Sequence, residues 1–89
     1  MAREADQIAQ DHAAMLGSVS VITSVIATHN KGSDATDEDF GHDMTHDEKK
    51  ARVTRSNGYL VHMKALEDWG SESFTEIDKA ISAANSFTA

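Results

Sequence analysis

The sequence predicts an all-α protein, a small three-helix bundle with a long acidic loop between its first and second helices. Apolar residues recur at helical spacing in three segments, capping-box patterns precede two of them, and proline is absent. With 89 residues the chain fits one domain, residues 1–89. We expect helices near 2–29, 46–69 and 73–87.

The first helix is predicted from a stripe of apolar residues and histidines that repeats every three or four positions, as in a heptad. β-branched residues are dense between Ser18 and Ile26, so a strand is the competing prediction there. We favour the helix because the spacing continues through this stretch without a change of phase. Asn30 or Gly32 can end it. The stripe consists of Ala5, Ile8, His12, Met15, Val19, Ile22, Ile26 and His29.

The second helix is predicted to begin after Thr45, because Thr45 and Glu48 have the spacing of a capping box. Asn57-Gly58 lies inside it, and this dipeptide favours a tight turn in other settings. We keep one helix because the flanking residues have a helical pattern, and we expect it to end near Trp69. Its apolar face contains Val53, Leu60, Met63 and Leu66.

The third helix is predicted from a second capping-box pattern, formed by Ser73 and Glu76. Apolar residues follow at the spacing of one helix face, which makes this segment amphipathic. These residues are Phe74, Ile77, Ile81, Ala84 and Phe87.

The composition restricts the classes of partner and chemistry. The net charge of −7 disfavours nucleic acid and anionic membranes as partners. Without cysteine, the chain has no disulfide, no zinc–thiolate site and no cysteine nucleophile. The first residues carry three acidic side chains, unlike a secretory signal peptide. We expect a cytoplasmic protein or one within a viral particle, with no membrane partner and no direct nucleic-acid partner.

The acidic loop is the first candidate site, because seven of the 15 acidic residues lie between Asp34 and Glu48. Residues 37–48 partly match an EF-hand calcium loop, yet His42 occupies the position where that loop needs glycine. We therefore expect a solvated acidic loop that holds no metal. Its acidic residues are Asp37, Glu38, Asp39, Asp43, Asp47 and Glu48.

Histidines and basic residues are the next candidates. His42 and His46 are four positions apart and could share a metal on a helix, but spacing fixes no third ligand. His12 and His29 lie on the apolar stripe, either as hydrogen-bonded residues at the core edge or as pH-responsive positions in a helix interface. A basic cluster follows the acidic loop. It either balances the negative charge of that loop or contacts phosphate or an acidic partner. The cluster contains Lys49, Lys50, Arg52 and Arg55.

No nucleophile-elbow, P-loop or dinucleotide motif occurs, so we expect neither an enzyme nor a cofactor. The leading hypothesis is an assembly or adaptor protein that packs against its own copies or a larger complex, for example a virion component of a bacterial virus. The alternative is an acidic regulator or inhibitor that occupies a basic, nucleic-acid-binding site on a target protein. Because the third helix is shorter than the first, we expect an uncovered interaction surface among Ile8, Met15, Val19, Ile22, Ile26 and Trp69.

Overall fold

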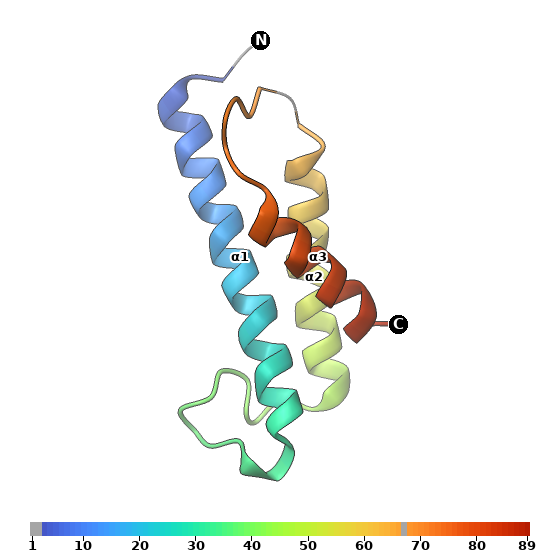
Figure 1. Ribbon diagram of the computed structural model, residues 1–89. Coiled ribbons are helices and arrows are strands. Elements are labelled where there is room, and N and C mark those ends of the chain that lie inside the picture. The colour runs from blue at the N-terminus through green and yellow to red at the C-terminus, as the bar shows by residue number, and fades with distance from the viewer. Residues whose placement is uncertain (1–2, 67) are drawn as a thin grey trace.

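The computed structural model describes residues 3–66 and 68–89, and over these residues it has three α-helices and no strand. This confirms the all-α three-helix prediction. The helices are α1 (Ala5–Lys31), α2 (His46–Lys64) and α3 (Thr75–Phe87), and a 3-10 turn, η1 (Gly32–Asp34), follows α1. Helices α1 and α2 run antiparallel, and the shorter α3 crosses them diagonally (Figure 1). The molecule is elongated, with extents of 48 × 26 × 18 Å.

Helix α1 forms where the strand was the competing prediction, and it continues unbroken from Ala5 to Lys31. The predicted start at residue 2 lies outside the described residues, while Arg3 and Glu4 are described and precede the helix. Gly32 ends the helix with φ of 57°, a backbone conformation that favours glycine.

The capping box predicted at the start of α2 is present. The Thr45 hydroxyl accepts a hydrogen bond from the Glu48 backbone N–H at 3.1 Å, and the Glu48 carboxylate accepts one from the Thr45 N–H at 2.9 Å. The helix also passes through Asn57-Gly58 without a break. Here the Asn57 side-chain amide donates to the Asn85 side-chain oxygen at 2.9 Å, which joins α2 to α3.

The predicted end of the second helix at Trp69 is wrong, because α2 ends at Lys64. After the helix the chain turns back, and Asp68 has a positive φ of 70°. The Trp69 indole N–H then donates to the Met63 carbonyl oxygen at 3.1 Å. The same carbonyl oxygen also accepts a hydrogen bond from the Leu66 backbone N–H at 3.1 Å, and the bond from Trp69 places the indole against the end of α2.

The capping box predicted at Ser73 and Glu76 is also wrong. Helix α3 begins at Thr75 after Phe74, and the side chain of Phe74 makes no capping bond. The Ser73 hydroxyl instead lies 3.4 Å from the backbone nitrogen of Thr75, two residues on rather than three. The Ser73 carbonyl oxygen is bound by His12 of α1, and this long-range contact orients the chain before α3.

The core lies between the helices and is made of side chains from α1, α2 and α3 together with Trp69. Most of the predicted stripe of α1 faces it. An 18-residue window of Ala5–Asp34 has a mean hydropathy of 1.2, so by length and composition this helix could cross a membrane. A core helix of a globular protein has the same properties. The absence of a membrane partner therefore stays a prediction. The core residues are Met15, Ile22, Val25, Val53, Leu60, Trp69, Ile77, Ala80 and Ala84.

Candidate functional site

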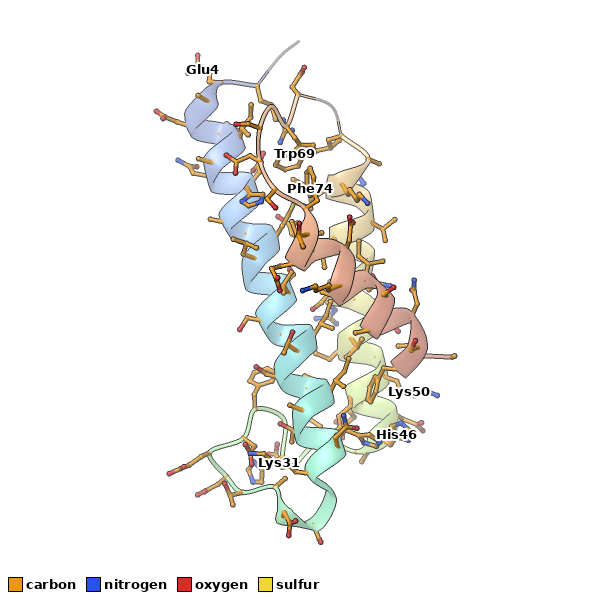
Figure 2. The ribbon with its side chains drawn as sticks, viewed as in Figure 1. Glu4, Lys31, His46, Lys50, Trp69 and Phe74 are labelled. Atoms are coloured by element: carbon orange, nitrogen blue, oxygen red, sulfur yellow. The ribbon has the colours of Figure 1, made fainter. Side chains whose placement is uncertain are left out.

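Two groups of aromatic rings hold the opposite ends of the bundle, and each includes one histidine from the α1 stripe. The first, the Trp69 cluster, consists of Arg3, His12, Trp69 and Phe74. The Trp69 and Phe74 rings meet edge to face at 5.4 Å between centroids, and the Arg3 guanidinium lies 4.1 Å from the centre of the Trp69 ring. Figure 2 shows Trp69 and Phe74 together at the end of the molecule where α1 begins.

In the Trp69 cluster, His12 has a hydrogen-bond acceptor near each ring nitrogen. Its Nε2 lies 2.7 Å from the Ser73 carbonyl oxygen, and its Nδ1 lies 3.3 Å from a carboxylate oxygen of Glu72. A protonated imidazole is a donor at both nitrogens, so it can bind both acceptors at once. The cluster thus ties α1 to the segment that leads into α3.

The second group, the His29 cluster, consists of His29, His46 and Phe87. The two imidazole rings are stacked, with centroids 4.4 Å apart and planes 21° from parallel. The Phe87 ring packs edge to face with both imidazoles. Its centroid lies 5.2 Å from that of His29 and 5.7 Å from that of His46. Since these residues come from the last turns of α1 and α3 and the first residue of α2, the cluster joins the ends of all of these helices.

The His29 cluster disfavours positive charge. Burial lowers the pKa of His29 below its ordinary value of 6.5, and the nearby positive charges of His46 and Lys49 lower that pKa further. The helix dipole opposes a cation at His46, the first residue of α2, but favours one at His29, which lies in the last turn of α1. At His29, burial and the neighbouring positive charges outweigh this dipole, so the neutral ring is favoured.

The acidic loop is anchored to α1 by Asp39. Its carboxylate accepts hydrogen bonds from the Lys31 ammonium at 2.6 Å and from the Thr36 backbone N–H at 2.9 Å. These bonds lower the pKa of Asp39 below its ordinary value. At Gly41, φ is 80° and an added Cβ would lie 2.9 Å from the Met44 sulfur, so the loop turns tightly there. Five predicted acidic residues are exposed around this loop, and of these only Glu48 is bound in the capping box. They are Asp37, Glu38, Asp43, Asp47 and Glu48.

The side chains weighed as metal ligands are not gathered into one site. Across residues 3–66 and 68–89 the structure has no group of three or more histidine, aspartate or glutamate side chains placed to hold a metal ion. Asp39 is bound to Lys31, and the Glu48 carboxylate belongs to the capping box. His46 stacks on His29, a residue that the spacing argument did not pair with it.

The predicted interaction surface needs correction. It consists of Trp69 and part of the stripe from Ala5 to His29, which we call the inner stripe of α1. Met15 and Ile22 are fully buried and Trp69 is 7% exposed, so the chain's own helices enclose these side chains. Ile8, Val19 and Ile26 are partly buried and pack against the same core. The connection that precedes α3 adds to this cover, because Trp69 and Ser73 contact Arg3 and His12 near the start of α1.

The opposite face of α1 is the surface that the sequence reasoning missed. Its residues are exposed and follow one another at intervals of four, three, four, three and four, which is a second heptad-like spacing. Small side chains dominate it, so a search for large apolar residues passes over it. We call this surface the outer stripe of α1; it consists of Ala9, Ala13, Leu16, Ser20, Thr23 and Ala27.

The basic cluster lies along the first half of α2, and Arg52 of this cluster faces the acidic loop. Its guanidinium lies 5.9 Å from the centre of the Phe40 ring. At the end of the same helix, Val61 of α2 and Ala65, which directly follows α2, form an apolar hollow with Ile81 of α3.

Comparison of the chain with protein families, with curated proteins and with solved structures finds no match.

Proposed function

We propose that this chain is a non-enzymatic assembly protein, in which the outer stripe of α1 packs against a helix of a second copy. The observation that carries the proposal is the second heptad-like spacing on a fully exposed face. A heptad spacing keeps a set of residues in line along one side of a helix, which is what a partner helix contacts. From Ala9 to Ala27 the stripe is about 27 Å long.

Charge favours this face over the rest of the surface. The net charge of −7 makes two copies repel each other wherever acidic side chains meet. No residue between His12 and Asn30 carries a formal charge, so α1 offers an uncharged strip where two copies can approach. Leu16, 41% exposed, is the largest apolar side chain on this strip, and its alanine and serine neighbours permit close contact between backbones.

A seam along one helix is a small interface, so we expect an equilibrium between monomer and oligomer that depends on concentration. Sedimentation velocity over roughly 10 μM to 1 mM, the range of weak specific association, measures this equilibrium. Leu16→Glu introduces a charge into the stripe and should keep the protein monomeric across the range. Circular dichroism should show unchanged helix content, because Leu16 lies outside the core.

Val61→Glu is the matched control, since Val61 is an apolar residue of α2 that is 51% exposed. It should leave the self-association of the wild type unchanged. A wild type that stays monomeric at roughly 1 mM would contradict the proposal. So would dissociation by Val61→Glu and not by Leu16→Glu, which would move the interface to the hollow between α2 and α3.

The acidic-regulator alternative has one observation in its favour, the exposed carboxylates of Asp37, Glu38, Asp43 and Asp47 around the anchored loop. Such a surface resembles a polyanion and would bind a basic site through screened charges. Titration against a basic nucleic-acid-binding protein at roughly 50 mM and 200 mM salt tests it. Binding that weakens at the higher salt and is lost on replacing these four residues by their amides would favour this function.

A further inference from the structure

We propose that the His29 cluster is an acid-released clasp: protonation of its imidazoles frees the end of α3 from α1 and α2, while the Trp69 cluster stays closed. The geometry points to a clasp because one small group of rings joins the end of α1, the start of α2 and the end of α3. Its opening would therefore separate helix ends without first disrupting the middle of the core.

The neutral rings pack well, and the charged rings do not. Protonation of both imidazoles would place two positive charges on rings whose centroids are 4.4 Å apart. Lys49, which already lowers the pKa of His29, adds a third positive charge from α2. His46 is exposed, but the two rings are closer together than the Debye length of roughly 8 Å at physiological salt, so salt screens this repulsion only in part.

Acidic groups also lie near the cluster, but the charges that act on His29 most strongly are the positive ones of His46 and Lys49. On α2, the Glu48 carboxylate is bound to the Thr45 backbone in the capping box, and the Asp47 side chain is exposed. At the end of α1, Lys31 is positive and binds Asp39 of the loop. Helix α3 contributes no titratable side chain after Lys79.

The direction of the pH effect follows from the lowered pKa of His29. At pH values below about 6.5 the open form, with an ordinary histidine, binds a proton more readily than the closed form. The closed clasp therefore loses stability as the pH falls through this range. Above it both forms hold a neutral His29, and the clasp has its full stability.

Helix α3 is the element that moves. It has 13 residues, against 27 in α1 and 19 in α2, and Phe87 is its last residue. At its other end, α3 is held through Phe74 in the Trp69 cluster. Acid thus releases the short helix at one end and leaves it tethered at the other.

Nuclear magnetic resonance of the ring protons during a titration from about pH 7.5 to about pH 5 tests the clasp. We expect His29 to titrate with a midpoint below 6.5, the ordinary value. The Phe87 ring resonances should move toward unfolded positions as His29 is protonated, while the Trp69 indole resonance stays in place. His29 that titrates without any response of Phe87 would overturn the proposal.

The double variant His29→Phe, His46→Phe keeps three packed rings and removes the titration. Its Phe87 resonances should not depend on pH, and its helix content should match the wild type. The control His62→Gln changes an exposed histidine of α2 and should leave the wild-type response unchanged. A double variant that still opens in acid would overturn the proposal.

Lys49→Gln provides a second test that does not alter the stacked rings. Loss of this charge should raise the midpoint of His29 and reduce the displacement of Phe87 at about pH 5. If neither quantity changed, charge repulsion would not be what opens the cluster.

Discussion

A histidine of α1 lies at each end of the bundle, and the two histidines have neighbours of opposite charge. His12 and His29 both lie on the inner stripe of α1, and both contact aromatic rings. His12 has the Glu72 carboxylate beside it, whereas His29 has a second imidazole and the positive charge of Lys49. Two histidines on one apolar stripe thus have neighbours of opposite charge, so a place on the stripe does not determine the electrostatic surroundings of a histidine.

The two ends also differ in how much apolar surface they bury. Trp69 is 7% exposed and its indole N–H is hydrogen-bonded, so the Trp69 cluster is part of the core. Phe87 is only partly buried and packs against the edge of that core. We therefore expect the Trp69 end to be the more stable one, and the following substitutions test this ranking.

The largest effect is expected for Trp69→Ala. Removal of a buried tryptophan typically lowers the free energy of unfolding by about 3–5 kcal/mol, a large share of the stability of a small domain. Urea denaturation followed by circular dichroism measures this loss. An effect smaller than that of the next substitution would reverse the proposed ranking of the two ends.

A smaller loss is expected for Phe87→Ala, about 1–2 kcal/mol, because this ring is only partly buried. The same substitution uncovers His29, and burial is the main cause of the lowered pKa of that residue. The pKa of His29 should therefore rise toward 6.5, which a proton titration detects. A pKa that stayed low would show that burial by Phe87 is not its cause.

Glu72→Gln should have the smallest effect, less than about 1 kcal/mol near neutral pH, because Glu72 is partly exposed and such ion pairs contribute little. Thermal melts of the wild type and the variant near neutral pH measure the difference. A loss larger than that of Phe87→Ala would contradict the ranking of the two ends.

Local signals in the sequence were sufficient for most of the fold. The heptad spacing identified α1 against the competing strand, and Thr45 with Glu48 located the start of α2. The errors occurred where side chains beyond the local pattern contact the backbone. The Trp69 indole donates to the Met63 carbonyl after α2 has ended, and the Ser73 carbonyl is bound by His12 of another helix.

The candidate sites were harder to predict for the same reason. Spacing pairs His42 with His46, but the fold stacks His46 on His29, which lies across the whole loop in the sequence. The outer stripe does have a signal, its heptad-like spacing. Its side chains are mostly small, so the sequence alone does not mark it as a contact surface. The structure adds that all six residues of the stripe are exposed on one face of α1.

The order of the helices along the chain has a consequence for folding kinetics. Helices α1 and α2 are joined by the loop that Lys31 and Asp39 close, so their contacts link nearer parts of the sequence than those between α1 and α3. Contacts between nearer residues cost less entropy to form and usually form earlier. The connection between α2 and α3 is also short, so we expect the contacts of α2 with α1 and with α3 to form early. The contacts between α1 and α3, the helices farthest apart in the sequence, should then form last and complete the bundle.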